Sequence, residues 1–439
     1  MQSQRKHLRL PLIVVLIVVP LLQIQIHRGR LPASMSSKVE ERRKGSLSQN
    51  QTAVMELLAN ESGIATIEGG SNQPYLVALR NDTTVSINAT KTIFWDGDSS
   101  SKLPAWLRDY MAWHHETRQT LNITNWRQCK YLLLRCVAGD AKCAGASDRL
   151  KTLPVQLLLA SQARRLFFIH WSRPAPLEEF LVPPEGGLLD WRLPPWLANK
   201  LNAEAVSPIW TFDREKYRVG WRNNSQTVIR VRNMLYAHPI YDEQRSQGEA
   251  SMWEAYHDIW KAVFTPSPNV QARIDQILHA LGLTPNSYVA VHVRAVYTKN
   301  TTGTREEVNA VNCGVQLVAG DKSPRMPIYF ASDSVVVTQR AIRYGQTHHI
   351  QVVGRVNVSE TMHLDRGSNF LKRTNDWKGR PPSDFYDTFV DLYLLALAKC
   401  SSFGTGGYGS WGAVIGPNFG CKTINHRKRQ CKKDVTSAR

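Results

Sequence analysis

The feature that most constrains the fold is the alternation of short apolar strands with helices along the chain. Residues 130–137, KYLLLRCV, and residues 165–171, RLFFIHW, are each predicted to form a buried strand. Between them, residues 148–164 are predicted to form a helix. A strand, a helix and a second strand within about 45 residues indicate a βαβ unit with parallel strands.

The same alternation returns in the second half of the chain. Strands are predicted at residues 287–296, 326–334 and 349–356. A helix over residues 335–345 is predicted to close at Gly345, and a buried helix over residues 381–400 to begin with Ser383 as N-cap. Helices are also expected at 103–118 and within 250–282. The predicted fold class is therefore α/β, with two βα-rich halves.

The N-terminus indicates the cellular compartment. Residues 10–26 carry no charge and follow a short basic segment, so they form either a short signal anchor or a cleaved signal peptide. We favour a type II membrane protein of the Golgi or endoplasmic reticulum with a luminal body. Residues 1–9 are then a cytosolic tail, 10–26 the transmembrane signal anchor and 27–102 a luminal stem rich in Ser, Asn and Thr.

Glycosylation sequons support the luminal side. The pattern Asn-x-Ser/Thr occurs more often than the roughly three matches that chance would give, and it marks surface loops of secreted proteins. The sites are Asn50, Asn60, Asn81, Asn88, Asn122, Asn223, Asn300 and Asn357. We therefore expect a glycoprotein.

Cysteine use fits an oxidising compartment. Seven cysteines allow three disulfides and one remaining thiol, with a pairing that the sequence leaves open. The spacing of Cys129, Cys136 and Cys143 is not that of a zinc site. We expect no bound metal.

The net charge of +19 favours an anionic ligand: a nucleic acid, lipid headgroups or a nucleotide diphosphate. Part of the charge lies in the termini, including a basic tail at residues 426–439. The sequons and the apolar N-terminus argue against nucleic-acid binding. We expect no nucleic-acid partner.

Three motifs in the second half lie where predicted strands end, which is where open α/β sheets bind ligands. The first is His292 and Arg294 in HVR, and the second is Asp333 in FASDS. The third is the glycine-rich segment FGTGGYGSWG, residues 403–412, which follows a short predicted strand and opens a helix. Glycine allows close backbone approach, and a helix start offers N–H groups to phosphate. Its candidate donor-binding residues are Gly406, Gly407, Ser410 and Trp411.

The order HVR, YFASDS and DLYLLALAKCSSFGTGGYGSWGA resembles the three motifs of the GDP-fucose-dependent fucosyltransferases. The likeness is greatest to the protein O-fucosyltransferase and α1,2/α1,6-fucosyltransferase superfamily. The resemblance implies a GT-B fold, with an acceptor-side Rossmann-like domain at 103–285 and a GDP-fucose-side domain at 286–425. It also implies metal-independent transfer with inversion, from GDP-fucose to a hydroxyl of a glycan or glycoprotein.

The resemblance also implies roles for individual residues. Arg294 would hold the diphosphate and stabilise the leaving GDP, Asp333 would bind the guanine or ribose, and Ser410 would bind phosphate. Asp148 is the first candidate for the general base, with Glu178 and Glu179 as alternates.

The chain also departs from the family pattern. A second arginine usually follows the first, but here that position is Ala295, and no carboxylate lies in residues 295–300. The alternative function is therefore a non-catalytic relative of the same fold that binds a nucleotide sugar or glycan. WDGDSS at 95–100 contains an Asp-x-Asp pair, but it lies before the first βαβ unit, so we interpret it as an acidic turn.

Overall fold

The structure is a computed structural model, and all its described residues belong to the compact unit Glu61–Arg439. They are residues 103–140, 143–203, 207–210, 225–231, 241–243, 245–295, 306–318, 326–356, 364, 379–417, 424–425 and 431–433. The predicted cytosolic tail, signal anchor and stem lie outside them, as does WDGDSS. Within the described ranges, no helix has the length and apolar character needed to cross a membrane.

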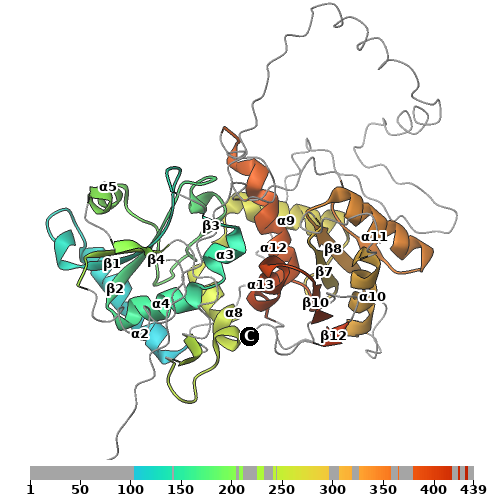
Figure 1. Ribbon diagram of the computed structural model, residues 1–439, viewed down its shortest axis with the longest axis horizontal. Helices are drawn as coiled ribbons and strands as arrows, with labels where there is room; N and C mark the ends of the chain where they lie inside the picture. Colours follow the sequence, from blue (N-terminus) through green and yellow to red (C-terminus); the bar gives the residue numbers. More distant parts are fainter. Residues whose placement is uncertain are drawn as a thin grey trace, which may run out of the picture. The chain divides into compact units, whose positions relative to one another are not determined.

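The first half contains a four-stranded sheet in which every pair is parallel (Figure 1). Its order is β2-β1-β5-β4, with bounds Arg165–Trp171, Lys130–Cys136, Val228–Val231 and Ser207–Trp210. The strands are apolar on both faces because helices cover them, as parallel sheets require. The two predicted strands of this half are confirmed.

The predicted helix over 148–164 is two helices, α3 (Ala146–Leu150) and α4 (Leu153–Gln162). The break falls at Lys151 and Thr152, directly before α4, which has Pro154 in its first turn. Proline has no N–H and its ring excludes a continuous helix through that position, so it suits a helix start. The predicted helix at the start of the body is confirmed as α2 (Ala105–Thr120), which packs on α4 and β2.

The second half is built on a six-stranded sheet of order β12-β11-β10-β7-β8-β9. The central strands β10 (Cys400–Phe403), β7 (Val289–Val293) and β8 (Ile328–Ser332) are parallel. The outer ones are β9 (Val352–Val353), β11 (Ile424–Asn425) and β12 (Lys432–Lys433), of which only β12 is antiparallel. The three strands predicted here exist, although β9 is much shorter than 349–356.

Helix boundaries in this half differ from the prediction. α11 (Val335–Thr347) continues past Gly345, which is glycine because a Cβ there would lie 2.6 Å from Ile350 O and Val352 Cγ2. α12 (Tyr386–Ala396) begins after the 3₁₀ turn η6 (Pro382–Phe385), so Ser383 is not its N-cap. The sequence reading also missed α10 (Glu306–Val318), which packs on β7 and α11.

The helical region 250–282 contains α8 (Met252–Val263) and α9 (Pro268–Ala280). Between them β6 (Thr265–Pro266) pairs with β3 (Leu181–Val182), next to the 3₁₀ turn η5 (Leu177–Glu179). The loop around β3 leads to α5 (Pro195–Ala203). Trp191 in that loop is fully buried and donates to Val263 O at 2.8 Å, so it is a core residue.

Two disulfides join described residues, Cys136–Cys143 and Cys313–Cys431. Cys400 is also disulfide-bonded, and Cys129 is a free thiol. These findings agree with three bridges and one remaining thiol. The first bridge closes the loop between β1 and α3, and the second joins α10 to the segment that carries β12.

Candidate functional site

The site forms around the glycine-rich turn between β10 and α13 (Gly407–Ile415). Gly406 is exposed and has φ +96°, a value that L side chains rarely adopt. It lets the chain turn sharply out of β10 into the helix. The helix begins at Gly407, so Ser410 and Trp411 lie one turn after its start. The first N–H groups of α13 have no partners within the helix and can donate hydrogen bonds to an anion.

Arg294 lies directly against this turn. It follows the end of β7, which is the strand beside β10. A Cβ at Gly406 would lie 3.0 Å from Arg294 Nη1 and 3.1 Å from its Cδ. Because glycine has no side chain, Gly406 leaves room for the Arg294 guanidinium at the start of α13. The structure thus brings together two of the predicted donor-binding residues.

His292, two residues earlier on β7, is buried on the same side. Its ring lies 5.2 Å from the Tyr408 ring, centre to centre, and a Cβ at Gly409 would lie 2.9 Å from His292 Nδ1. His292 therefore packs beneath the first turn of α13. In this position it supports the turn rather than facing outward from it.

Asp333 ties the ends of two neighbouring strands together. Its Oδ1 accepts a hydrogen bond from the backbone N–H of Ala295 at 2.6 Å. Ser334, not Asp333, caps α11, because its side chain accepts from Val337 N. The carboxylate thus holds the segment that follows Arg294.

Ser410 receives a contact that the sequence reading missed. Lys151 Nζ donates to Ser410 Oγ at 3.1 Å, and Ser410 Oγ donates to Gly407 O at 3.0 Å. Lys151 also lies over the Trp253 ring, with Nζ 5.1 Å from its centre. Burial lowers the pKa of Lys151, and the charge of Asp148 opposes that shift. A lysine that follows α3 therefore adds positive charge at the start of α13.

Asp148 is on α3, which contacts α13. Its Oδ2 accepts from Gly145 N at 3.1 Å, so it caps its own helix. Burial raises the pKa of the Asp148 carboxyl, and the Gly145 hydrogen bond and the charge of Arg294 reduce the rise. A raised pKa makes a carboxylate a better proton acceptor near neutral pH.

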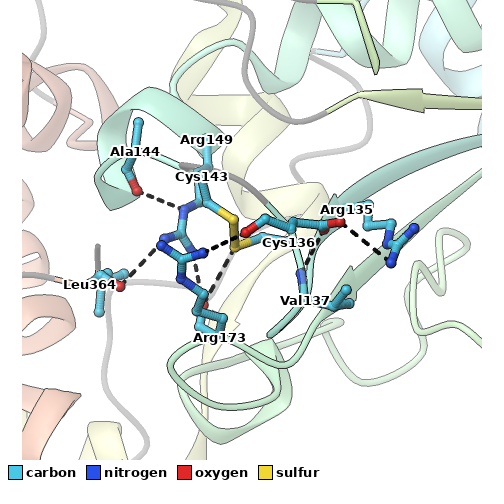
Figure 2. The surroundings of a disulfide bond; sticks show 9 residues. Arg135, Cys136, Val137, Cys143, Ala144, Arg149, Arg173 and Leu364 are labelled. Atoms are coloured by element: carbon cyan, nitrogen blue, oxygen red, sulfur yellow. Dashed lines mark hydrogen bonds and ion pairs between the residues drawn. A yellow bond between two sulfur atoms is a disulfide. The ribbon is translucent and has the colours of Figure 1, made fainter. Parts of the chain in front are cut away.

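Arg149, next to Asp148, was not predicted as part of the site. It is fully buried and donates to the backbone carbonyls of Ala144 and Arg173, both at 2.9 Å. Its guanidinium also lies 4.5 Å from the centre of the Trp171 ring. Figure 2 shows it beside the Cys136–Cys143 disulfide. Arg149 fixes α3, and with it the position of Asp148.

Trp411 was predicted to bind the donor, and the structure places it in the core instead. It is fully buried, and its indole N–H donates to the Tyr256 hydroxyl at 2.9 Å. The tryptophan lies one turn into α13 on the face that packs against α8, so it cannot line the start of the helix. Gly407 stays at the helix start, where a Cβ would lie 3.4 Å from Ser147 Oγ of α3.

The two alternate bases lie in another environment. Glu179 Oε2 accepts from the Tyr386 hydroxyl at 3.4 Å, and Glu178 lies near Arg192 and Asp190. In the described part of the chain, no group of three or more His, Cys, Asp or Glu side chains could hold a metal ion.

No protein-family model matches the sequence, and no curated protein matches it significantly. Among solved structures, the chain resembles a point mutant of Arabidopsis thaliana FUT1 in complex with GDP. The match has a TM-score of 0.52 at 10% identity and covers 79% of this chain and 84% of that one.

Other matches have lower TM-scores, and two of them are as follows. The NodZ α-1,6-fucosyltransferase soaked with GDP-fucose gives 0.41 at 14% identity, covering 68% of this chain and 94% of that chain. The fucosyltransferase NodZ from Bradyrhizobium gives 0.42 at 15% identity, covering 68% and 95%. The predicted α/β fold of GT-B type is confirmed by the parallel sheets and the FUT1 match.

Proposed function

We propose that this chain is a glycosyltransferase that transfers fucose from GDP-fucose to a glycan or protein hydroxyl with inversion and without a metal. The observation that carries the proposal is the pairing of Arg294 with the start of α13 at Gly406. A guanidinium and a helix start side by side suit a diphosphate. The FUT1 structure with the same fold contains GDP, which supports a guanine nucleotide as the donor.

In the proposed reaction, each residue acts by charge or by position. Arg294 and the N–H groups of α13 stabilise the negative charge that develops on the leaving GDP. Lys151 adds charge through Ser410, and Asp333 holds the segment after Arg294 through Ala295 N. Asp148 takes the proton of the acceptor hydroxyl as general base.

The test is calorimetric binding of GDP-fucose to the full-length chain in EDTA, with Arg294→Ala beside the wild type. We expect micromolar binding by the wild type and roughly ten- to a hundredfold weaker binding by the variant. A folded wild-type protein that does not bind would overturn the donor assignment. An assay for fucosylated product distinguishes this proposal from the alternative function, because a non-catalytic relative would bind GDP-fucose without transferring fucose.

We further propose that the body lies in the secretory lumen, behind the predicted signal anchor. Asn122, the sequon within the described residues, is exposed, and its Oδ1 accepts from the Thr124 hydroxyl at 2.6 Å. The other seven sequons lie outside the described residues. Loss of mass on treatment with an endoglycosidase would support this localisation, and an Asn122→Gln variant should lose one glycan.

A further inference from the structure

A cluster of basic residues lies at the end of the first sheet, away from the turn that the proposed function uses. Arg135, His170 and Arg230 are each the second-last residue of their strands, β1, β2 and β5. These strands are adjacent and parallel, so the three residues share one edge. We call them the basic edge.

The strand register places the basic edge on one face of the sheet. Arg135 pairs with His170, and Arg230 pairs with Leu133, two residues before Arg135. Paired residues in parallel strands, and residues two apart on one strand, point to the same side. All three side chains therefore leave the same face at its carboxyl edge.

Among the described residues, one carboxylate lies near the two guanidinium groups of the basic edge. It is that of Asp140, whose Oδ1 lies 3.4 Å from Arg135 Nη2. The second oxygen of Asp140 accepts from Val137 N at 2.9 Å. Arg230 donates to Leu201 O at 3.2 Å, which satisfies a hydrogen bond but neutralises no charge.

Several nitrogens of the basic edge have no hydrogen-bond partner. Among the described residues, these are Nε of Arg135, Nε of Arg230 and Nδ1 of His170. Buried polar atoms are usually paired, so three exceptions in one cluster require a reason. Two other arginines of this half, Arg118 and Arg192, share the Asp190 carboxylate, at 2.8 Å each.

Electrostatics agree with an excess of positive charge. Burial lowers the pKa of His170, and the charges of Arg135 and Arg230 lower it further, whereas Asp140 opposes them. Burial also lowers the pKa of Arg230, and the charge of Arg135 adds to that shift. The charges of Arg135 and Arg230 thus repel each other and disfavour protonation of His170, and a bound anion would relieve that repulsion.

The basic edge is joined to the loop that carries the proposed base. Arg173 Nη1 donates to Asp140 O at 3.0 Å, and Arg149 Nη1 donates to Arg173 O at 2.9 Å. Figure 2 shows Arg135, Arg173 and Arg149 around the Cys136–Cys143 disulfide. One loop system therefore positions both the basic edge and Asp148 at the carboxyl end of the sheet, where α/β folds bind ligands.

We propose that Arg135, His170 and Arg230 form an anion subsite for the carboxylate of an acidic glycan acceptor. The inference rests on the proposed function for the idea that an acceptor binds this half. Guanidinium groups bind carboxylates in bidentate geometry and are only weakly hydrated, so they suit a partly buried subsite. The net charge of +19 would also speed the approach of a polyanionic glycan.

The test measures binding of a galacturonic acid hexamer to the full-length chain by calorimetry at low salt, with its methyl ester as the neutral probe. We expect the acid to bind at least tenfold more tightly than the ester. Arg135→Gln with Arg230→Gln should remove that difference. Arg164→Gln is the matched control, because Arg164 is exposed and precedes β2 at the opposite edge of the same sheet. It should bind as the wild type.

Each outcome decides for or against the subsite. Equal binding of acid and ester, wild-type binding by the double variant, or equal weakening by the control would overturn it. Competition by millimolar sulfate but no preference for the acid hexamer would show a simple ion site and would also overturn it. GDP affinity, measured on the same samples, reports separately on folding and on the proposed function, since the three residues of the basic edge belong to β1, β2 and β5 and not to the turn or α13. Tight acid binding without GDP binding would retain the subsite and remove the fucosyltransferase proposal.

Discussion

At the scale of single residues, Asp148 combines a structural and a proposed chemical role. It caps α3 through Gly145 N, and burial raises its pKa above the value in an unfolded chain. The folded protein therefore holds this proton more tightly than the unfolded chain. Its contribution to stability is present at low pH and is lost as the pH rises through the folded pKa.

Asp148→Asn tests the two roles separately. Asparagine keeps an oxygen for Gly145 N but has no charge to bury, so stability relative to wild type should be unchanged near pH 4 and equal or higher at pH 8. Fucosyl transfer should fall about 10²- to 10⁴-fold, the usual contribution of a general base. Thermal unfolding at both pH values and a product assay measure the two effects. Retained activity would place the base elsewhere.

The two cations near Asp148, Arg149 and Lys151, have different roles: one is structural and the other belongs to the site. Arg149 is satisfied by backbone carbonyls in the core, whereas Lys151 reaches the first turn of α13. The two cations are two residues apart and are both close to Asp148 in the chain. Only the second adds charge at the proposed donor site.

At the scale of elements, the turn into α13 depends on Gly406. Gly406→Ala would force a side chain into a left-handed conformation and against Arg294. We expect a loss of about 1 to 3 kcal/mol in unfolding free energy and at least tenfold weaker GDP binding. Gly139→Ala is the control, because nothing lies within 4 Å of its Cβ position. Calorimetry that finds both variants alike would refute a role for this turn.

The two disulfides that join described residues constrain elements over very different chain lengths. The cysteines of one are separated by 7 residues and those of the other by 118. On the chain-entropy model, removing the first as Cys136→Ala with Cys143→Ala should cost about 2 to 3 kcal/mol. Removing the second, Cys313→Ala with Cys431→Ala, should cost about 5 kcal/mol. Denaturant unfolding gives both values, and a larger loss for the shorter loop would mean that the β1–α3 loop is held mainly by native contacts.

At the scale of the whole molecule, the candidate site joins residues from both halves. α13 belongs to the second half, yet it contacts α3 and α8, and Lys151 and Tyr256 bond to its residues. A ligand at the start of α13 would therefore stabilise contacts between segments that are far apart in the sequence.

GDP at a hundred times its dissociation constant should raise the unfolding free energy by about 2.7 kcal/mol. Lys151→Met should weaken GDP binding about tenfold, which lowers that gain by about 1.4 kcal/mol at the same concentration. Lys130→Met is the control, because Lys130 is exposed at the start of β1. Thermal unfolding with and without GDP measures each gain, and equal gains in both variants would exclude Lys151 from the site.

The sequence by itself determined most of the central strands and the order of the motifs, but not β4 and β5. Buried parallel strands are short apolar runs, so β1, β2, β7 and β8 could be predicted from local pattern. The positions of Arg294, Asp333 and Gly406 follow from the same strands, because ligand-binding residues lie where parallel strands end. Helix boundaries could not be predicted as well. The start of α4 near Pro154 and the 3₁₀ turn before Tyr386 each depend on one or a few residues, which a periodic pattern does not locate.

Only the tertiary structure decided which side chains reach the site. Trp411 and Ser410 are neighbours in the sequence, but one packs into the core against α8 and the other meets Lys151. Lys151 and the start of α13 are more than 250 residues apart, with a separation of 259 to Ser410. The basic edge likewise depends on the register of three strands. Such contacts arise from how the elements pack, and no local pattern in the sequence encodes them.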